Sequence, residues 1–177
     1  MTHYPKNLFL TSNPGVGKTT LIKEVCLPYM KEVGGFYTEE IREDGKRLGF
    51  KIKTFSGEEG ILAQKGMKSQ YKLNKYGIDI KIIEDLGVKS IRDALKNKKV
   101  VIIDEIGSME CISPLFREVV VECLNSEKNV LATIRYRSQP FTDEVKQFPN
   151  TELLLLTREN YYNIKMRVKK WLENIMV

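Results

Sequence analysis

Eight consecutive residues near the start of the chain have the composition of a phosphate-binding loop. Residues 13–20 read Asn-Pro-Gly-Val-Gly-Lys-Thr-Thr, between an apolar run and a helical pattern. Gly15 and Gly17 let the backbone wrap closely around phosphates, so that backbone N–H groups and the positive end of the following helix converge on them. Lys18 is the residue type that reaches the β- and γ-phosphates, and the Thr19 hydroxyl is the type that binds Mg²⁺. The segment therefore predicts a P-loop for a nucleoside triphosphate.

One position of this loop departs from the usual pattern, G-x-x-x-x-G-K-[ST], because its first glycine is replaced by Ser12. A serine there costs strain if the backbone φ is positive and is harmless if φ is negative. The loop residues that we predict to bind nucleotide are Ser12, Asn13, Pro14, Gly15, Val16, Gly17, Lys18, Thr19 and Thr20.

Two acidic residues follow an apolar run in the second half of the chain. Residues 99–103 read Lys-Val-Val-Ile-Ile, which predicts a buried strand, and Asp104 and Glu105 come next. A Mg²⁺-nucleotide site needs a carboxylate at such a strand end, so we expect Asp104 and Thr19 to hold the metal. We expect Glu105 to position and deprotonate the attacking water, with Lys18 as the second catalytic residue. The acidic pair favours hydrolysis over transfer of phosphate to an acceptor.

Two arginines could add positive charge at the same edge of the sheet. Arg135 and Arg137 lie in the loop predicted after the strand 129–134, where α/β sheets bind ligands. A guanidinium that reaches the γ-phosphate would stabilise charge in the transition state. A solvated loop arginine is the alternative interpretation of each residue.

Apolar runs alternate with helical patterns along the chain, which is typical of an α/β protein. We expect a three-layer P-loop NTPase fold, in which a mostly parallel central sheet is flanked by helices. Residues 36–42 and 47–55 read as strands on either side of Glu-Asp-Gly-Lys, and Asp-Gly is a strong hairpin signal. The sequence therefore predicts an inserted β-hairpin at about residues 36–55. Since no linker or repeat is present, residues 1–177 are expected to form one domain.

The composition excludes several classes of protein. His3 is the single histidine, which argues against histidine triads and histidine-based metal sites. The three cysteines, Cys26, Cys111 and Cys123, show no pairing or metal-ligand spacing. The sequence also lacks a run of about 18 apolar residues, the length needed to span a membrane. We therefore expect a cytoplasmic protein with no membrane partner, and a monomer.

The net charge of +6 fits an anionic partner, such as a nucleotide or a nucleic acid. Four lysines alternate with two tyrosines in a composition that could bind single-stranded nucleic acid. They are Lys65, Lys68, Lys72 and Lys75, with Tyr71 and Tyr76. No recognised nucleic-acid module accompanies them, so nucleic acid is not the favoured partner.

Four segments together resemble the small P-loop nucleoside-triphosphatase family, which includes cancer-related nucleoside-triphosphatase and its thermophilic broad-specificity relatives. They are Asn13–Thr20, Gly35-Phe36-Tyr37-Thr38-Glu39-Glu40-Ile41-Arg42, Lys75-Tyr76-Gly77 and Asp104-Glu105-Ile106-Gly107-Ser108-Met109-Glu110. The resemblance implies one α/β domain that hydrolyses ATP, GTP, CTP and UTP to the diphosphate and phosphate with Mg²⁺. It also adds Gly107 to the nucleotide-binding residues. Ser108 stands where the family pattern has lysine.

Two other functions share the P-loop and stay open from the sequence. A nucleotide or small-molecule kinase would need an arginine-rich lid, and the chain contains no convincing one. A nucleotide-dependent switch would use hydrolysis only to control when it binds nucleic acid. The chain contains no Asn-Lys-x-Asp motif for reading guanine, so base selectivity is expected to be loose.

Overall fold

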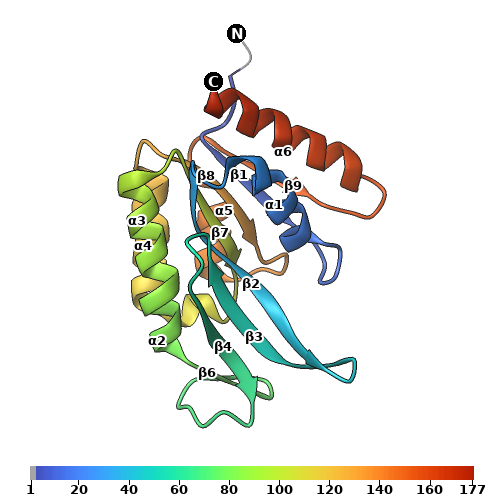
Figure 1. Cartoon of the computed structure of the whole chain (residues 1–177), viewed down its shortest axis with the longest axis vertical. Coiled ribbons are helices and arrows are strands. Elements are labelled where there is room, and N and C mark those ends of the chain that lie inside the picture. The colour runs from blue at the N-terminus through green and yellow to red at the C-terminus, as the bar shows by residue number, and fades with distance from the viewer. Residues whose placement is uncertain (1–2) are drawn as a thin grey trace.

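One nine-stranded sheet runs through the part of the chain that the computed structural model describes, residues 3–177 (Figure 1). The strand order is β5-β6-β4-β3-β2-β7-β8-β1-β9. The strands are β1 (Asn7–Thr11), β2 (Val33–Glu43), β3 (Lys46–Thr54), β4 (Glu59–Lys65), β5 (Lys72–Leu73), β6 (Tyr76–Ile78), β7 (Val100–Ile106), β8 (Asn129–Ile134) and β9 (Thr151–Leu155).

The half of the sheet that contains β2, β7, β8, β1 and β9 is parallel throughout. Its central strands are apolar on both faces, because helices cover both sides of a parallel sheet. All five residues of β1 are buried, and so are residues 130–134 of β8. These strands confirm the predicted parallel core.

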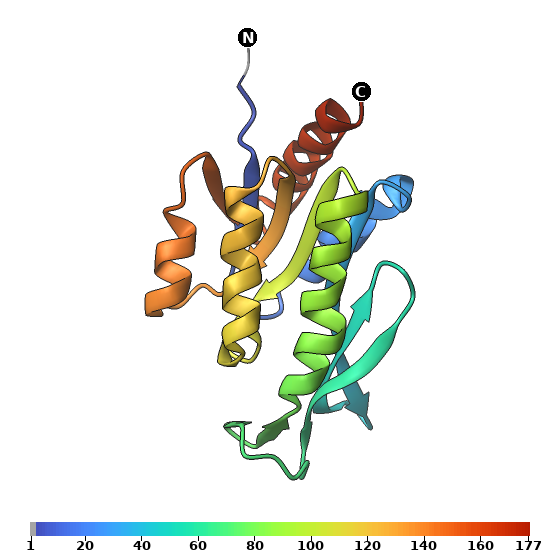
Figure 2. The same ribbon diagram turned by 90° about the vertical axis from the view of Figure 1, so that its left-hand side faces the viewer.

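Helices form a layer on each face of this sheet, which confirms the three-layer prediction (Figures 1 and 2). One face packs against α1 (Lys18–Cys26) and α6 (Tyr161–Met176). The other packs against η2 (Ile83–Val88), α3 (Lys89–Asn97), α4 (Pro114–Asn125) and α5 (Pro140–Lys146). The short helices are η1 (Leu27–Tyr29), α2 (Ile80–Ile82) and η3 (Glu110–Ile112). Across residues 3–177, no helix has both the length and the apolar character that crossing a membrane requires.

The predicted hairpin is present as β2 and β3, but it is more than an insertion. The first part of β2, Val33–Phe36, pairs in parallel with β7, and the rest of β2 pairs antiparallel with β3. The strands β4, β6 and β5 then continue the antiparallel pairing, so the whole sheet is mixed. We did not predict this extension in full, because its strands β5 and β6 are only two and three residues long.

Three neighbouring parallel strands bring the candidate site residues to one edge of the sheet. The P-loop follows β1, Asp104 and Glu105 lie near the end of β7, and Arg135 follows β8. Since these strands are parallel neighbours, their carboxyl ends meet at the same edge, where α/β sheets bind ligands.

Candidate active site

The P-loop leads from β1 into α1 with the backbone conformation that its glycines allow. Gly15 and Gly17 have φ values of 82° and 109°, which residues with a side chain rarely adopt. Gly17 is the N-cap of α1, and no side chain accepts a hydrogen bond from the first turn of that helix. The N–H groups of this turn are therefore directed at whatever binds there, as in other phosphate-binding helix starts.

Ser12 is accommodated without backbone strain. Among non-glycine residues in the described chain, φ is positive only at Asp44, Asn74 and Asn150. Ser12 is buried, and its hydroxyl donates to the carbonyl of Asn13 at 2.8 Å and accepts from Lys18 Nζ at 3.1 Å. The serine is therefore harmless to the loop, and its side chain helps to hold Lys18 near the P-loop backbone.

Asp104 is a buried carboxylate that two hydroxyl groups hold in place. Its Oδ2 accepts from Thr19 Oγ1 at 2.7 Å, and its Oδ1 accepts from Thr133 Oγ1 at 2.5 Å. Burial raises the pKa of Asp104, and the hydrogen bonds from Thr133, Thr19 and the backbone of Thr38 oppose that rise. The structure thus brings together Thr19 and Asp104, the two predicted metal ligands. We did not assign a role to Thr133, whose signal in the sequence is a polar residue within a buried strand.

A β-bulge in β7 explains how two consecutive carboxylates can both serve one site. Ile103 pairs with Ala132 and Ile106 pairs with Ile134, so β7 contains one residue more than β8 over this stretch. Successive side chains of a regular strand point to opposite faces, whereas a bulge redirects one of them. Asp104 can therefore contact Thr19 while its neighbour Glu105 also reaches the P-loop lysine.

Glu105 lies beside Lys18 and stays open to water. The distance from Glu105 Oε2 to Lys18 Nζ is 3.8 Å, and 32% of the Glu105 side chain is exposed. Desolvation raises the pKa of Glu105, and so does the charge of Asp104, while Lys18 and Arg135 lower it. A carboxylate with a raised pKa that remains accessible to water has the properties of a general base.

Gly107 and Glu110 lie next to Glu105. A methyl group placed on Gly107 would lie 2.7 Å from Glu105 Oε1 and 2.9 Å from Glu110 Oε2. Gly107 therefore provides the space in which two carboxyl groups approach each other, whereas the sequence suggested only a contact with nucleotide. We assigned no role to Glu110 from the sequence, although it is the last acid of the Asp-Glu-Ile-Gly-Ser-Met-Glu segment.

The two candidate arginines differ in their surroundings. Arg135 donates to the hydroxyl of Ser108, to Gln139 Oε1 at 3.4 Å and, through Nε, to the carbonyl of Arg137 at 3.0 Å. Its charge lowers the pKa of Glu105, which places it near the acidic pair. The side chain of Arg137 is exposed, and only its carbonyl takes part in these contacts. Of the two, Arg135 is the one held close to the candidate catalytic residues.

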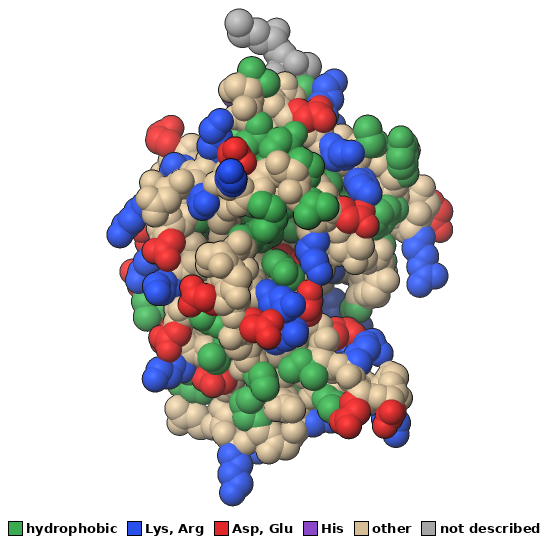
Figure 3. Space-filling model, in the orientation of Figure 1, with side chains coloured by type: hydrophobic (Ala, Val, Ile, Leu, Met, Phe, Trp, Pro, Cys, Tyr) green, Lys and Arg blue, Asp and Glu red, His purple; other side chains and the backbone are tan. Residues whose placement is uncertain are grey.

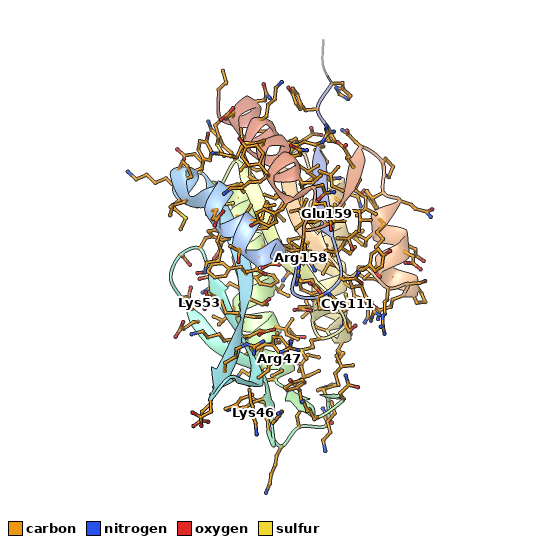
Figure 4. All side chains as sticks on the ribbon, turned by 90° about the vertical axis from the view of Figure 1, so that its right-hand side faces the viewer. Lys46, Arg47, Lys53, Cys111, Arg158 and Glu159 are labelled. Carbon is orange, nitrogen blue, oxygen red and sulfur yellow. The ribbon has the colours of Figure 1, made fainter. Side chains whose placement is uncertain are left out.

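The site opens on one side of the molecule. The right-hand outline of the space-filling view is indented between the upper part of the molecule and the tip of β2 and β3 (Figure 3). Figure 4 shows this side face on, with Arg158 and Glu159 above, Lys46 and Arg47 of β3 below, and Cys111 at an intermediate height. The hairpin and the loop before α6 thus flank the side on which the P-loop lies.

The lysine-rich antiparallel extension does not offer its aromatic rings as a stacking surface. Tyr76 is buried and packs edge-on against Phe50, with ring centroids 5.5 Å apart. Lys75 Nζ lies 5.7 Å from the centroid of the Tyr76 ring, and Tyr71 is packed against the core. Because bases would need exposed rings, these contacts give no support to binding of single strands by stacking.

The oxygen atoms of Thr19 and Asp104 suit a Mg²⁺-nucleotide complex better than a metal centre whose ligands all come from protein. Within residues 3–177, no group of three or more His, Cys, Asp or Glu side chains could enclose a metal ion. Mg²⁺ in nucleotide sites is usually held by one or two protein oxygens, together with phosphates and water. The contact between Thr19 Oγ1 and Asp104 Oδ2 supplies such a pair of oxygens.

Comparisons with known proteins identify the family to which the sequence is similar. The profile of a family described as NTPase matches residues 7–169. The chain is 49% identical to nucleoside-triphosphatase THEP1 of Thermotoga petrophila over 154 residues, which cover 86% of this chain and 85% of that protein. It is 34% identical to the human cancer-related nucleoside-triphosphatase over 171 residues, which cover 88% of this chain and 90% of that protein.

A solved structure extends the similarity to the fold. The crystal structure of THEP1 from the hyperthermophile Aquifex aeolicus superposes with a TM-score of 0.83 at 36% sequence identity. The match covers 92% of this chain and 96% of that chain. The chain therefore shares its overall fold with that solved structure.

Proposed function

This chain belongs to the NTPase family and is a nucleoside-triphosphatase, and we propose that it carries out hydrolysis at the P-loop with Glu105 as the general base. The observation that carries this proposal is the position of Glu105, which is accessible to water and lies 3.8 Å from the P-loop lysine. A kinase transfers phosphate to an acceptor, so it does not need a base placed beside the phosphates to deprotonate water.

In this mechanism each residue has one task. The N–H groups of the P-loop and the ammonium of Lys18 bind the phosphates and neutralise their charge. Glu105 accepts a proton from a water molecule while the water oxygen attacks the γ-phosphorus. The bond from the γ-phosphorus to the bridging oxygen breaks, and the nucleoside diphosphate leaves with that electron pair. Arg135 is our candidate for a further positive charge near the γ-phosphate.

We propose Mg²⁺ as the cofactor and assign Thr19 and Asp104 to hold it. Their contact at 2.7 Å joins a hydroxyl and a carboxylate, the oxygen types that Mg²⁺ prefers. When bound, Mg²⁺ neutralises charge on the phosphate oxygens. Thr133 has a supporting role, because its hydrogen bond orients the Asp104 carboxylate toward Thr19.

We propose loose base selectivity, with ATP, GTP, CTP and UTP all accepted. The start of α6 lies beside the P-loop, since Cε2 of its first residue, Tyr161, is 3.3 Å from the place of a methyl group on Gly17. The side-chain amide of Asn160, just before α6, is engaged by the preceding loop, since its Oδ1 accepts from Thr157 N at 2.7 Å and its Nδ2 donates to the carbonyl of Leu155 at 2.8 Å. It is therefore not free to read the edge of a base.

Phosphate release from the four triphosphates and their diphosphates tests this function, with Lys18→Ala as the control. We expect comparable release from all four triphosphates in the presence of Mg²⁺, little release from diphosphates, and little from the Lys18→Ala variant. Release that requires a second, phosphate-accepting substrate would instead identify a kinase.

We also propose that the protein works in the cytoplasm. Cys26, Cys111 and Cys123 are all free and buried, and burial raises the pKa of each thiol to about 12. Buried, protonated thiols are compatible with a reducing compartment.

A further inference from the structure

Glu110 is a buried acid to which the proposed mechanism of hydrolysis assigns no role. It begins η3, and only 6% of its surface is exposed. The backbone of Glu110 and of Gly107 lowers the pKa of this carboxyl, but burial outweighs that effect. Among the ion pairs of residues 3–177, none involves Glu110. Burial of an acid without a cationic partner favours its neutral form.

Glu110 lies close to the proposed general base, whose charge affects it more than that of any other acid. Oxygens of Glu105 and Glu110 both lie within 3 Å of the place that a methyl group on Gly107 would occupy. Both side chains of this carboxyl pair, Glu105 and Glu110, thus approach the backbone of Gly107 closely.

The charges around Glu110 determine which member of the carboxyl pair holds a proton. Glu105 and Asp104 face it from β7, while the nearby Cys111 belongs to η3 and is a neutral thiol. Two cations lie in the neighbourhood, but Arg135 is bound to Ser108 and Arg117 donates to the carbonyl of Cys111 at 2.5 Å. Burial and the charge of Glu105 together raise the pKa of Glu110 to about 8.

We propose that Glu110 is a positioning residue for hydrolysis, which packs as a neutral carboxylic acid against the carboxylate of Glu105 and keeps it directed at the P-loop. This inference rests on the proposed role of Glu105 as the base. Glu110 exchanges no proton with substrate in this account. Its neutral form matters because a second negative charge beside Glu105 would repel both Glu105 and the γ-phosphate.

Kinetics of two variants separate positioning from simple packing. Glu110→Gln keeps the shape and neutrality of the acid, so its kcat at pH 7 should stay within about threefold of wild type. Glu110→Ala removes the packing, and its kcat should fall at least about tenfold with little change in KM, because Glu105 loses its support. Equal losses in both variants would overturn the proposal.

The pH profile adds a readout that a structural role would not move. Between pH 7 and pH 9 the wild-type kcat should fall about tenfold, because Glu110 ionises with a pKa of about 8. Glu110→Gln cannot ionise, so its kcat should stay nearly constant over the same range. The same alkaline loss in both proteins would contradict the inference.

Urea unfolding without nucleotide tests the neutral acid independently of activity. A carboxyl whose pKa is higher in the folded protein than in the unfolded chain stabilises the fold below its unfolded pKa of about 4.3, and that stabilisation is lost as the pH rises toward 8. The wild-type midpoint should therefore fall relative to that of Glu110→Gln between pH 5 and pH 8. Parallel midpoints would overturn the proposal even if Glu105 is the base. A fully active Glu105→Gln variant would instead remove the function on which it rests.

Discussion

At the scale of single residues, Asp104 is the group on which the proposed metal site depends. Its two oxygens accept from the hydroxyls of Thr19 and Thr133, and Lys18 is near enough to lower its pKa. A buried carboxylate is costly unless hydrogen bonds and a cation compensate for its charge. Hydrogen bonds are supplied by the fold, and the proposed Mg²⁺ would supply the cation.

We predict that Asp104→Asn raises the Mg²⁺ concentration for half-maximal turnover at least about tenfold, because the amide removes the negative charge that holds the metal. Titration of phosphate release with Mg²⁺ measures this change. Asp85→Asn, which alters an exposed acid in η2, is the matched control and should leave the titration unchanged. An Asp104→Asn variant with the wild-type Mg²⁺ requirement would contradict the assignment.

The sequence predicted the chemical groups of the site better than their arrangement. Lys18, Thr19, Asp104 and Glu105 were all named from their motifs, and the structure brings all four together. Glu110 could not be recognised in the same way, because its proximity to Glu105 depends on the turn at Gly107. A short motif identifies residue types, but contacts between its own members depend on backbone geometry.

At the scale of the elements, β2 joins the two halves of the sheet. It pairs in parallel with β7 near Gly35 and antiparallel with β3 further on. Gly35 has a φ of 112°, and a methyl group there would lie 2.0 Å from the carbonyl oxygen of Ile102 in β7. A close approach between two backbones therefore requires glycine at this position.

We predict that Gly35→Ala lowers the free energy of unfolding by at least about 3 kcal/mol, since the strained φ and the clash with β7 both act against it. Gly57→Ala is the matched control, because its φ is 101° and nothing lies within 4 Å of the added methyl group. It should cost only about 1–2 kcal/mol, from the strained backbone alone. Equal losses in urea unfolding would show that the contact with Ile102 is unimportant.

The parallel core could be predicted from the sequence, and the full antiparallel extension could not. The strands β1, β7 and β8 are continuous apolar runs, which is the pattern of strands buried on both faces. In contrast, β5 and β6 are too short to show a periodic pattern, and their pairing depends on contacts with β4. The bulge at Asp104 and Glu105 was equally hidden, because it is a mismatch between two strands.

At the scale of the whole molecule, all nine strands of residues 3–177 belong to one sheet. A single domain stays our prediction. The net charge of +6 suits a protein that binds polyphosphates. The P-loop joins β1 to α1 and Asp104 belongs to β7, so a ligand that contacts both ties together separate parts of the core.

A non-hydrolysable triphosphate with Mg²⁺ should therefore stabilise the whole fold. At a free concentration of a hundred times Kd, we expect about 2.7 kcal/mol of added stability, which corresponds to a rise of about 5–10 °C in Tm. Thermal unfolding followed by circular dichroism measures this shift. The Lys18→Ala variant at the same ligand concentration should show less than half of it, whereas an equal shift in both proteins would place the triphosphate elsewhere.

The central claim is that Glu105 activates water for attack on a triphosphate held by the P-loop. Single-turnover phosphate release by Glu105→Gln, with nucleotide affinity measured on the same variant, tests it most directly. We predict an affinity within about threefold of wild type and a rate of release at least about 100-fold slower, because the amide cannot accept the proton from water. Release near the wild-type rate with unchanged affinity would contradict the assignment of Glu105 as the base.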